Sequence, residues 1–169
     1  MSITMLSVVA LMIASAPAEN SNPWKLKKNK NGLKIWARSV EGSSIKEVKA
    51  EQLFSTPVKA IWEVIGDIES YPKFMPYVDS CEVIESFDGG RYEYERIRPP
   101  LIQARDYGLK GTLSVDEDNT HWRRWSPANH KAPPRKKNVV RIDVNEGYWK
   151  LVPKGAQTAV EYYIYTSPG

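Results

Sequence analysis

Cysteine and histidine are nearly absent from this sequence. Cys81 is the only cysteine among 169 residues, which excludes an internal disulfide framework and a zinc site built from several cysteines. The two histidines, His121 and His130, have no carboxylate or cysteine near them at metal-ligand spacing. No Ser/His/Asp pattern and no glycine-rich phosphate loop accompanies them. The sequence therefore predicts neither a metal nor a cofactor.

Long hydrophobic runs are absent as well. Residues 6–14 form an apolar stretch that is shorter than the roughly 20 residues of a membrane-spanning helix. Small residues, Ala14-Ser15-Ala16-Pro17-Ala18, follow it, although no Lys or Arg precedes it. We interpret residues 1–18 as a signal peptide cleaved after Ala18, which predicts that the mature chain, 19–169, is secreted or periplasmic. In an oxidising compartment the single thiol has to be buried or paired between chains.

Aromatic residues and a mild positive charge are what the sequence does have. Six Trp and nine Tyr bring the aromatic fraction to 11%, enough to build a core or a cavity from large rings. The formal net charge is +4. Acidic residues are interleaved with basic ones through most of the chain, so we do not expect nucleic-acid binding. The length suits one domain.

Periodicity predicts a mainly antiparallel sheet with few helices. We expect a short helix over residues 23–31 closed by Gly32, and an amphipathic helix over 57–66 with Thr56 as its N-cap. Alternation predicts strands over residues 33–38, 45–54, 80–87, 91–98, 103–115, 120–126, 139–145, 148–152 and 158–166. Short turns between strands, with helices inserted after the second strand, indicate an α+β fold.

Strand alternation also indicates which side chains share a face. Arg105 is in register with Leu109 and Leu113, whereas Asp106 points to the other side. An inward guanidinium needs a partner or a ligand. Two interpretations stay open: Arg105 meets a ligand in a cavity, or it forms a core ion pair with Glu93 or Glu95.

The next strand poses a similar question. Alternation over residues 120–126 pairs Trp122 with Arg124 on one face and Arg123 with Trp125 on the other. This sheet carries aromatic rings and a few charged side chains where a tight core would carry aliphatic ones. Such a mixture is suited to lining a cavity for an amphipathic small molecule.

Four segments, in this order, resemble START-type lipid-binding domains. They are residues 60–76, Arg105-Asp106-Tyr107, residues 147–153 and residues 158–162, and the resemblance extends from about Trp24 to Gly169. It implies a helix-grip fold, a curved antiparallel sheet around a long C-terminal helix with a hydrophobic ligand between them. The sequence stops at Gly169, where the family continues into that helix. We therefore expect residues 19–169 to be a START-like domain that is incomplete at its C-terminus.

The resemblance implies non-catalytic binding, and with it transport, of a lipid or other hydrophobic molecule. Our candidate ligand-binding residues are Trp62, Tyr94, Arg105, Trp122, Arg124 and Tyr162. Among them, Arg105, together with Arg124, is expected to hold a polar head group. The alternative is a helix-grip enzyme of the cyclase or hydrolase type acting on a hydrophobic substrate, with Glu93 and Glu95 as carboxylates on one face.

A basic cluster follows two prolines late in the sequence. Arg135, Lys136 and Lys137 come directly after Pro133-Pro134. The cluster is either a solvated loop or a contact for an anionic membrane surface, to which each basic residue would contribute about 1 kcal/mol.

Overall fold

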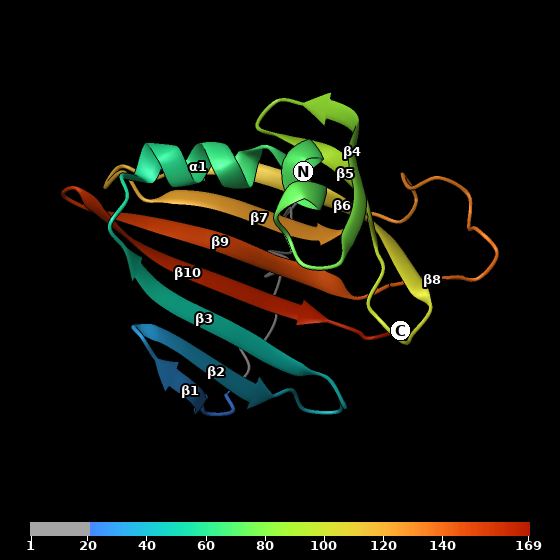
Figure 1. The fold of residues 1–169 in the computed structure, drawn as a ribbon, viewed down its shortest axis with the longest axis horizontal. Coiled ribbons are helices and arrows are strands. Elements are labelled where there is room, and N and C mark those ends of the chain that lie inside the picture. The colour runs from blue at the N-terminus through green and yellow to red at the C-terminus, as the bar shows by residue number, and fades with distance from the viewer. Residues whose placement is uncertain (1–20) are drawn as a thin grey trace, which may run out of the picture.

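A strongly curved sheet of ten strands runs through the protein, with one helix lying across it (Figure 1). The computed structural model describes residues 21–169, so the predicted signal peptide lies outside the described residues. The strand order is β1-β2-β3-β10-β9-β7-β6-β5-β4, with β8 beside β6. The strands are β1 (Lys25–Lys30), β2 (Leu33–Ser39), β3 (Lys46–Phe54), β4 (Val78–Phe87), β5 (Gly90–Ile97), β6 (Ala104–Val115), β7 (His121–Pro127), β8 (Val139–Arg141), β9 (Asn145–Lys154) and β10 (Gln157–Thr166).

The first element is a strand, and the helix predicted over residues 23–31 is wrong. β1 pairs with β2 in an antiparallel hairpin. Between them Asn31 and Gly32 have φ angles of 53° and 79°. Two successive positive φ angles define the tight turn that favours Asn-Gly and matches strand twist. Gly32 therefore closes a hairpin and does not cap a helix.

The amphipathic helix is confirmed, with a small change at its start. Helix α1 (Val58–Gly66) begins one residue after Pro57, which occupies the N-cap position in place of Thr56 and has extended backbone angles. A 3₁₀ helix, η1 (Ile68–Lys73), follows it. Because β1 is a strand, these helices come after the third strand and not the second. Neither has the length and apolar character that crossing a membrane requires, within residues 21–169.

The strand predicted over residues 139–145 is divided in two. β8 covers Val139–Arg141 and runs parallel to β6, while β9 starts at Asn145. The chain turns at Ile142, whose N–H donates to the Asp106 carbonyl oxygen at 2.9 Å. Apart from β8, the neighbouring strands are antiparallel, as predicted.

The two faces of the sheet differ in their contents. We call the face on which α1 lies the concave face. There Ile65 of α1 packs on Leu151 and Val160. The opposite, convex face carries a row of aromatic contacts in which Tyr148 and Tyr163 stack at 5.0 Å between ring centroids. The many rings in the sequence are thus divided between both faces.

Candidate functional site

An apolar chamber of about 470 Å³ lies between the helices and the concave face. α1 and η1 form its roof, and β3, β9 and β10 contribute its floor. The residues that line it are Phe54, Thr56, Ala60, Ile61, Val64, Ile65, Tyr71, Phe74, Met75, Trp149 and Val160. Its size lies within the range of small-molecule sites, and its surface is almost entirely carbon.

Two smaller spaces adjoin the chamber. A side pocket of about 200 Å³ shares Phe54, Trp149 and Val160 with it and extends toward β2 and β3. A polar pocket of about 50 Å³ shares Tyr71, Met75 and Trp149 with it. The polar pocket also reaches Arg123 and Glu95. The site therefore combines a long apolar volume with a small polar inner end.

Arg123, which lines the polar pocket, belongs to a buried ion pair. The Arg123 guanidinium donates to Glu93 at 2.5 Å, and the two side chains are only 5% and 2% exposed. The Arg91 Nε donates to the second oxygen of the same carboxylate at 2.7 Å. One buried carboxylate thus holds two guanidinium groups.

Arg123 keeps one hydrogen-bond donor unused. Among the described residues its Nε has no hydrogen-bond partner, although the atom is buried. Its guanidinium lies between the rings of Tyr71 and Trp125, at 5.7 and 5.6 Å from their centroids. Burial alone would lower the pKa of Arg123, but Glu93 outweighs it and raises that pKa. Arg123 is therefore a fixed cation in the polar pocket that adjoins the chamber, and its buried Nε–H has no partner among the described residues.

A second carboxylate, Glu95, completes the polar pocket. Glu95 accepts a hydrogen bond from the Tyr107 hydroxyl and lies 3.9 Å from Cys81 Sγ. Burial, with Glu93 nearby, raises the pKa of Glu95 above its ordinary value. Burial also raises the pKa of Cys81, so the thiol stays protonated at neutral pH. This group offers both acceptors and weakly acidic donors to a ligand.

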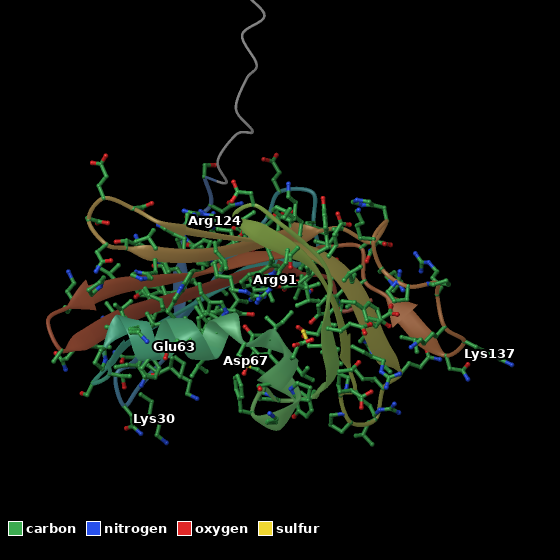
Figure 2. All side chains as sticks on the ribbon, turned by 90° about the horizontal axis from the view of Figure 1, so that it is seen from above. Lys30, Glu63, Asp67, Arg91, Arg124 and Lys137 are labelled. Carbon is green, nitrogen blue, oxygen red and sulfur yellow. The ribbon has the colours of Figure 1, made fainter. Side chains whose placement is uncertain are left out.

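Two hydrogen bonds tie the C-terminal end of α1 to the polar pocket. Arg91 Nη2 donates to the Gly66 carbonyl oxygen at 2.6 Å, and the Tyr71 hydroxyl donates to the Ile65 carbonyl oxygen at 2.7 Å. Figure 2 shows Arg91 between the sheet and the end of α1. The roof of the chamber is therefore anchored by Tyr71, which lines the polar pocket, and by Arg91, which pairs with Glu93.

Two of the predicted site residues lie on the concave face. Tyr162 packs against Trp149 at 4.5 Å between ring centroids and lines both smaller pockets. Trp62 lies on α1, packs on the cluster around Leu151, and meets the His121 ring edge-on at 5.2 Å. Trp62 therefore helps to seat the roof and does not line the chamber.

Arg105 has the predicted register but a different contact. It shares the face of Tyr107, yet its Nε donates to the Pro168 carbonyl oxygen at 2.8 Å and its Nη1 to the Gln103 carbonyl oxygen. The core ion pair with Glu93 or Glu95 is wrong for Arg105, because those carboxylates engage Arg91, Arg123 and Tyr107. Asp106 points to the other face, as alternation predicted, and pairs with Arg141 at 2.7 Å.

Three predicted site residues lie on the convex face, so the expectation that they share the chamber is wrong. The Tyr94 hydroxyl donates to Asp106 at 2.8 Å beneath the loop after β7. Trp122 and Arg124 stack on each other, with 3.8 Å from the guanidinium carbon to the ring centroid. Figure 2 shows Arg124 on the side of the sheet away from α1. Strand alternation separates the two faces but does not say which one is the inner face.

Sequence analysis missed Arg123 and Trp149 as site residues. The candidates from this strand were Trp122 and Arg124, but β7 carries one Arg and one Trp on each face, so alternation does not favour Arg124 over Arg123. Trp149 could have been found, because the β9–β10 register sets it opposite Tyr162, which was a candidate.

The Trp125 ring lies over Gly147, where an added Cβ would come within 2.5 Å of it, so the glycine makes room for the ring.

Two of the three residues in the basic cluster 135–137 have contacts within the protein, which the sequence does not indicate. Arg135 lies 3.7 Å from Asp143, and the Lys136 ammonium lies 5.9 Å from the Tyr94 ring. Lys137 projects at one end of the molecule (Figure 2).

Comparisons with known proteins agree with this geometry. Residues 55–165 match the family model described as polyketide cyclase / dehydrase and lipid transport. An uncharacterized protein of Pseudomonas aeruginosa is 28% identical over 98% of this chain and 82% of its own. The structure of a STAR-related lipid transfer protein from Xanthomonas axonopodis is 28% identical, with a TM-score of 0.80 over 86% of this chain and 82% of that one. The human StAR-related lipid transfer protein 5 shares the fold at 17% identity, with a TM-score of 0.74 over 88% and 74% of the two chains.

Proposed function

The chain belongs to the polyketide cyclase/dehydrase and lipid transport family, and on that premise we propose that it binds and transports a lipid or comparable hydrophobic molecule without transforming it. The observation that carries the proposal is the apolar chamber of about 470 Å³, which shares Tyr71, Met75 and Trp149 with a small polar pocket lined by the buried Arg123. Apolar burial would supply affinity at roughly 25 cal/mol per Å².

The polar pocket supports a proposal for the class of ligand. A hydrocarbon body would fill the chamber, and one hydrogen-bond acceptor, such as a carbonyl, hydroxyl or carboxylate oxygen, would reach Arg123. The pocket has room for little more than one small polar group, because its volume is about 50 Å³. A ligand with a single oxygen-bearing end therefore fits better than one with polar groups along its length.

Transport requires that the ligand can enter and leave. Phe54, Val64 and Phe74 line the chamber and are also exposed to solvent. These apolar side chains form a rim where a hydrophobic molecule could pass between the chamber and a lipid surface.

The basic cluster Arg135, Lys136 and Lys137 is proposed as a transient contact with an anionic membrane surface. Leu101 and Ile102 are exposed in the loop before β6, and the β8–β6 pairing brings Val139 beside Ala104. The basic loop and these apolar side chains therefore lie at one end of the sheet, a combination suited to an interfacial contact.

A catalytic role is the second candidate. Glu95, Tyr107 and Cys81 form a cluster at the inner end of the chamber, where a substrate would place its polar group. The raised pKa of Glu95 would suit a general acid.

One experiment separates these functions. The full-length protein, purified without detergent, is examined by native mass spectrometry, and its bound molecule is then released under denaturing conditions after long incubation. We expect a hydrophobic molecule recovered unchanged. A steady conversion into a product would establish the enzyme, and a chamber that never carries a hydrophobic molecule would contradict the proposal.

We also propose that the protein acts outside the cytoplasm, in the periplasm or as a secreted protein. The proposal is supported by the apolar run of residues 6–14 and by the burial of the one thiol, Cys81. Mass spectrometry of the protein from its native host should give an N-terminus at Glu19. An intact N-terminus in the cytoplasmic fraction would contradict it.

A further inference from the structure

The edge strand β1 carries a dense set of lysines. Lys25, Lys27, Lys28 and Lys30 lie within its six residues, and every side chain of the strand is exposed. Residues 20–40 contain no Asp or Glu. The ion pairs found within residues 21–169 include none of these four lysines. The positive charge of β1 is therefore open to an outside partner.

A β-bulge directs three of these lysines to one side. The register of β1 on β2 shifts between Leu26 and Lys28, and Lys27 has no direct partner. Lys25, Lys28 and Lys30 lie opposite Ala37, Ile35 and Leu33. Residues three apart on a regular strand point to opposite faces, so the bulge is what brings Lys25 onto the face of Lys28 and Lys30.

That side is the concave face. Lys28 lies opposite Ile35, Ile35 opposite Ala50, and Ala50 opposite Tyr162 of the side pocket. Directly opposed residues share a face, so one transverse row joins the edge lysine to the ligand site over about 14 Å, or three strand spacings. Figure 2 shows Lys30 on the same side of the sheet as Glu63 of α1, at the opposite end of the molecule from Lys137.

We propose that Lys25, Lys28 and Lys30 form a docking surface for an anionic lipid bilayer that turns the concave face toward the lipid. The inference rests on the proposed function, because a bilayer is both a source and an acceptor of a hydrophobic ligand. Charge complementarity attracts the lysines to the head groups, and the same approach brings the chamber rim, with exposed Phe54, to the lipid. A soluble polyanion would match the charge but not the adjoining apolar rim.

Protection of the sheet edge is the alternative role of these lysines. Lysines on an edge strand discourage pairing with another chain. A single charge directed inward suffices for that purpose, whereas here three charges align on one side with the ligand site. The two roles predict different behaviour when the charges are removed.

The test is co-sedimentation of the full-length protein, stripped of ligand, with vesicles. One set is pure phosphatidylcholine, and the other is phosphatidylcholine and phosphatidylglycerol in equal parts. The triple variant Lys25→Gln, Lys28→Gln, Lys30→Gln is compared with a control, Lys34→Gln, Lys110→Gln, Lys154→Gln, which removes three exposed lysines outside the concave row. Thermal unfolding of both verifies folding, and light scattering measures self-association.

We expect the β1 variant to lose about 100-fold in partitioning to anionic vesicles, since each lysine at such a surface contributes about fivefold. The control should bind nearly as the wild type does. Equal losses of vesicle binding in both variants would show that only the net charge of the protein matters, and would overturn the proposal. Normal vesicle binding with new self-association would establish edge protection in its place. Wild-type binding to duplex DNA but not to anionic vesicles would also overturn it. The assay uses ligand-free protein, so its outcome is independent of whether the chamber holds a lipid.

Discussion

Arg91 of β5 donates a hydrogen bond to the Gly66 carbonyl oxygen at 2.6 Å and so holds the last turn of α1 against the sheet. The same guanidinium is anchored by Glu93. The position of the chamber roof is thereby set by a side chain that is itself held at the chamber's polar end.

Arg91→Ala should loosen the roof more than it unfolds the protein. Loss of a hydrogen bond to a charged group costs about 1.5–3 kcal/mol, and Glu93 keeps its contact with Arg123. We expect faster release of a fluorescent lipid in stopped-flow transfer, with a modest fall in melting temperature. Arg98→Ala is the control, because Arg98 is exposed and lies 3.4 Å from Asp79. Equal release rates in both variants would show that the Gly66 contact does not restrain the roof.

Arg123→Met combined with Glu93→Gln should weaken the binding of ligands that carry an oxygen at one end. The double change avoids leaving one oxygen of the buried Glu93 carboxylate without its cation, because Arg91 contacts only the other oxygen. Loss of a hydrogen bond from a charged donor predicts about 10- to 100-fold weaker binding of a fatty acid, with little change for an alkane of equal length. Calorimetric titration gives both affinities. Parallel losses for the two ligands would assign the ion pair to stability alone.

Ala60→Trp should block the chamber. Ala60 lines the chamber from α1 and is itself exposed, so a tryptophan there would cover part of the chamber opening. We expect the bound lipid seen by native mass spectrometry to fall while the melting temperature stays close to that of the wild type. Lys59→Trp is the matched control, since Lys59 is exposed and pairs with Glu63. Full lipid occupancy in Ala60→Trp would place the ligand elsewhere.

Asp106→Asn should destabilise the whole fold without touching the chamber. Asp106 and Arg141 are buried on the convex face, with side chains 1% and 4% exposed. Breaking such a pair by removing one charge costs about 3–5 kcal/mol, so chemical denaturation should show a large loss in unfolding free energy. Asp143→Asn, at an exposed position, should cause almost none. A small effect at Asp106 would contradict the structure of this pair.

Glu95 should make the protein less stable as pH rises. Its pKa in the folded state lies above the ordinary value of 4.5, so the folded state binds the proton more tightly than the unfolded chain does. Stability therefore increases as pH falls from neutral toward 4.5, and Glu95→Gln should remove that part of the pH dependence. Arg141 lowers the pKa of Asp106 against the effect of burial. The protonation of Asp106 therefore reduces stability only at lower pH, outside the range in which Glu95 titrates. Parallel stability–pH curves for wild type and Glu95→Gln would refute the assignment.

Sequence patterns predicted the sheet and the amphipathic helix because alternation and helical spacing are local. They could not separate the two faces of β7, where Arg123 and Arg124 are equivalent by pattern and differ only in what the neighbouring strands place beside them. The helix expected over residues 23–31 depends on Gly32 as a C-cap, but a glycine with positive φ serves a hairpin turn equally well, and Asn31-Gly32 forms such a turn. The contact of Arg105 with Pro168 depends on residues 63 positions apart, which no local pattern reports.

The carboxylate of Glu93 has one oxygen on Arg123 and the other on Arg91. Because coupled equilibria are reciprocal, a ligand that engages Arg123 alters how firmly the roof is held, and any change in the roof alters the hold on the ligand. Affinity and residence time are therefore not independent properties at this carboxylate. Faster ligand exchange at unchanged selectivity would have to come from changes at the outer rim, at exposed side chains such as Phe54.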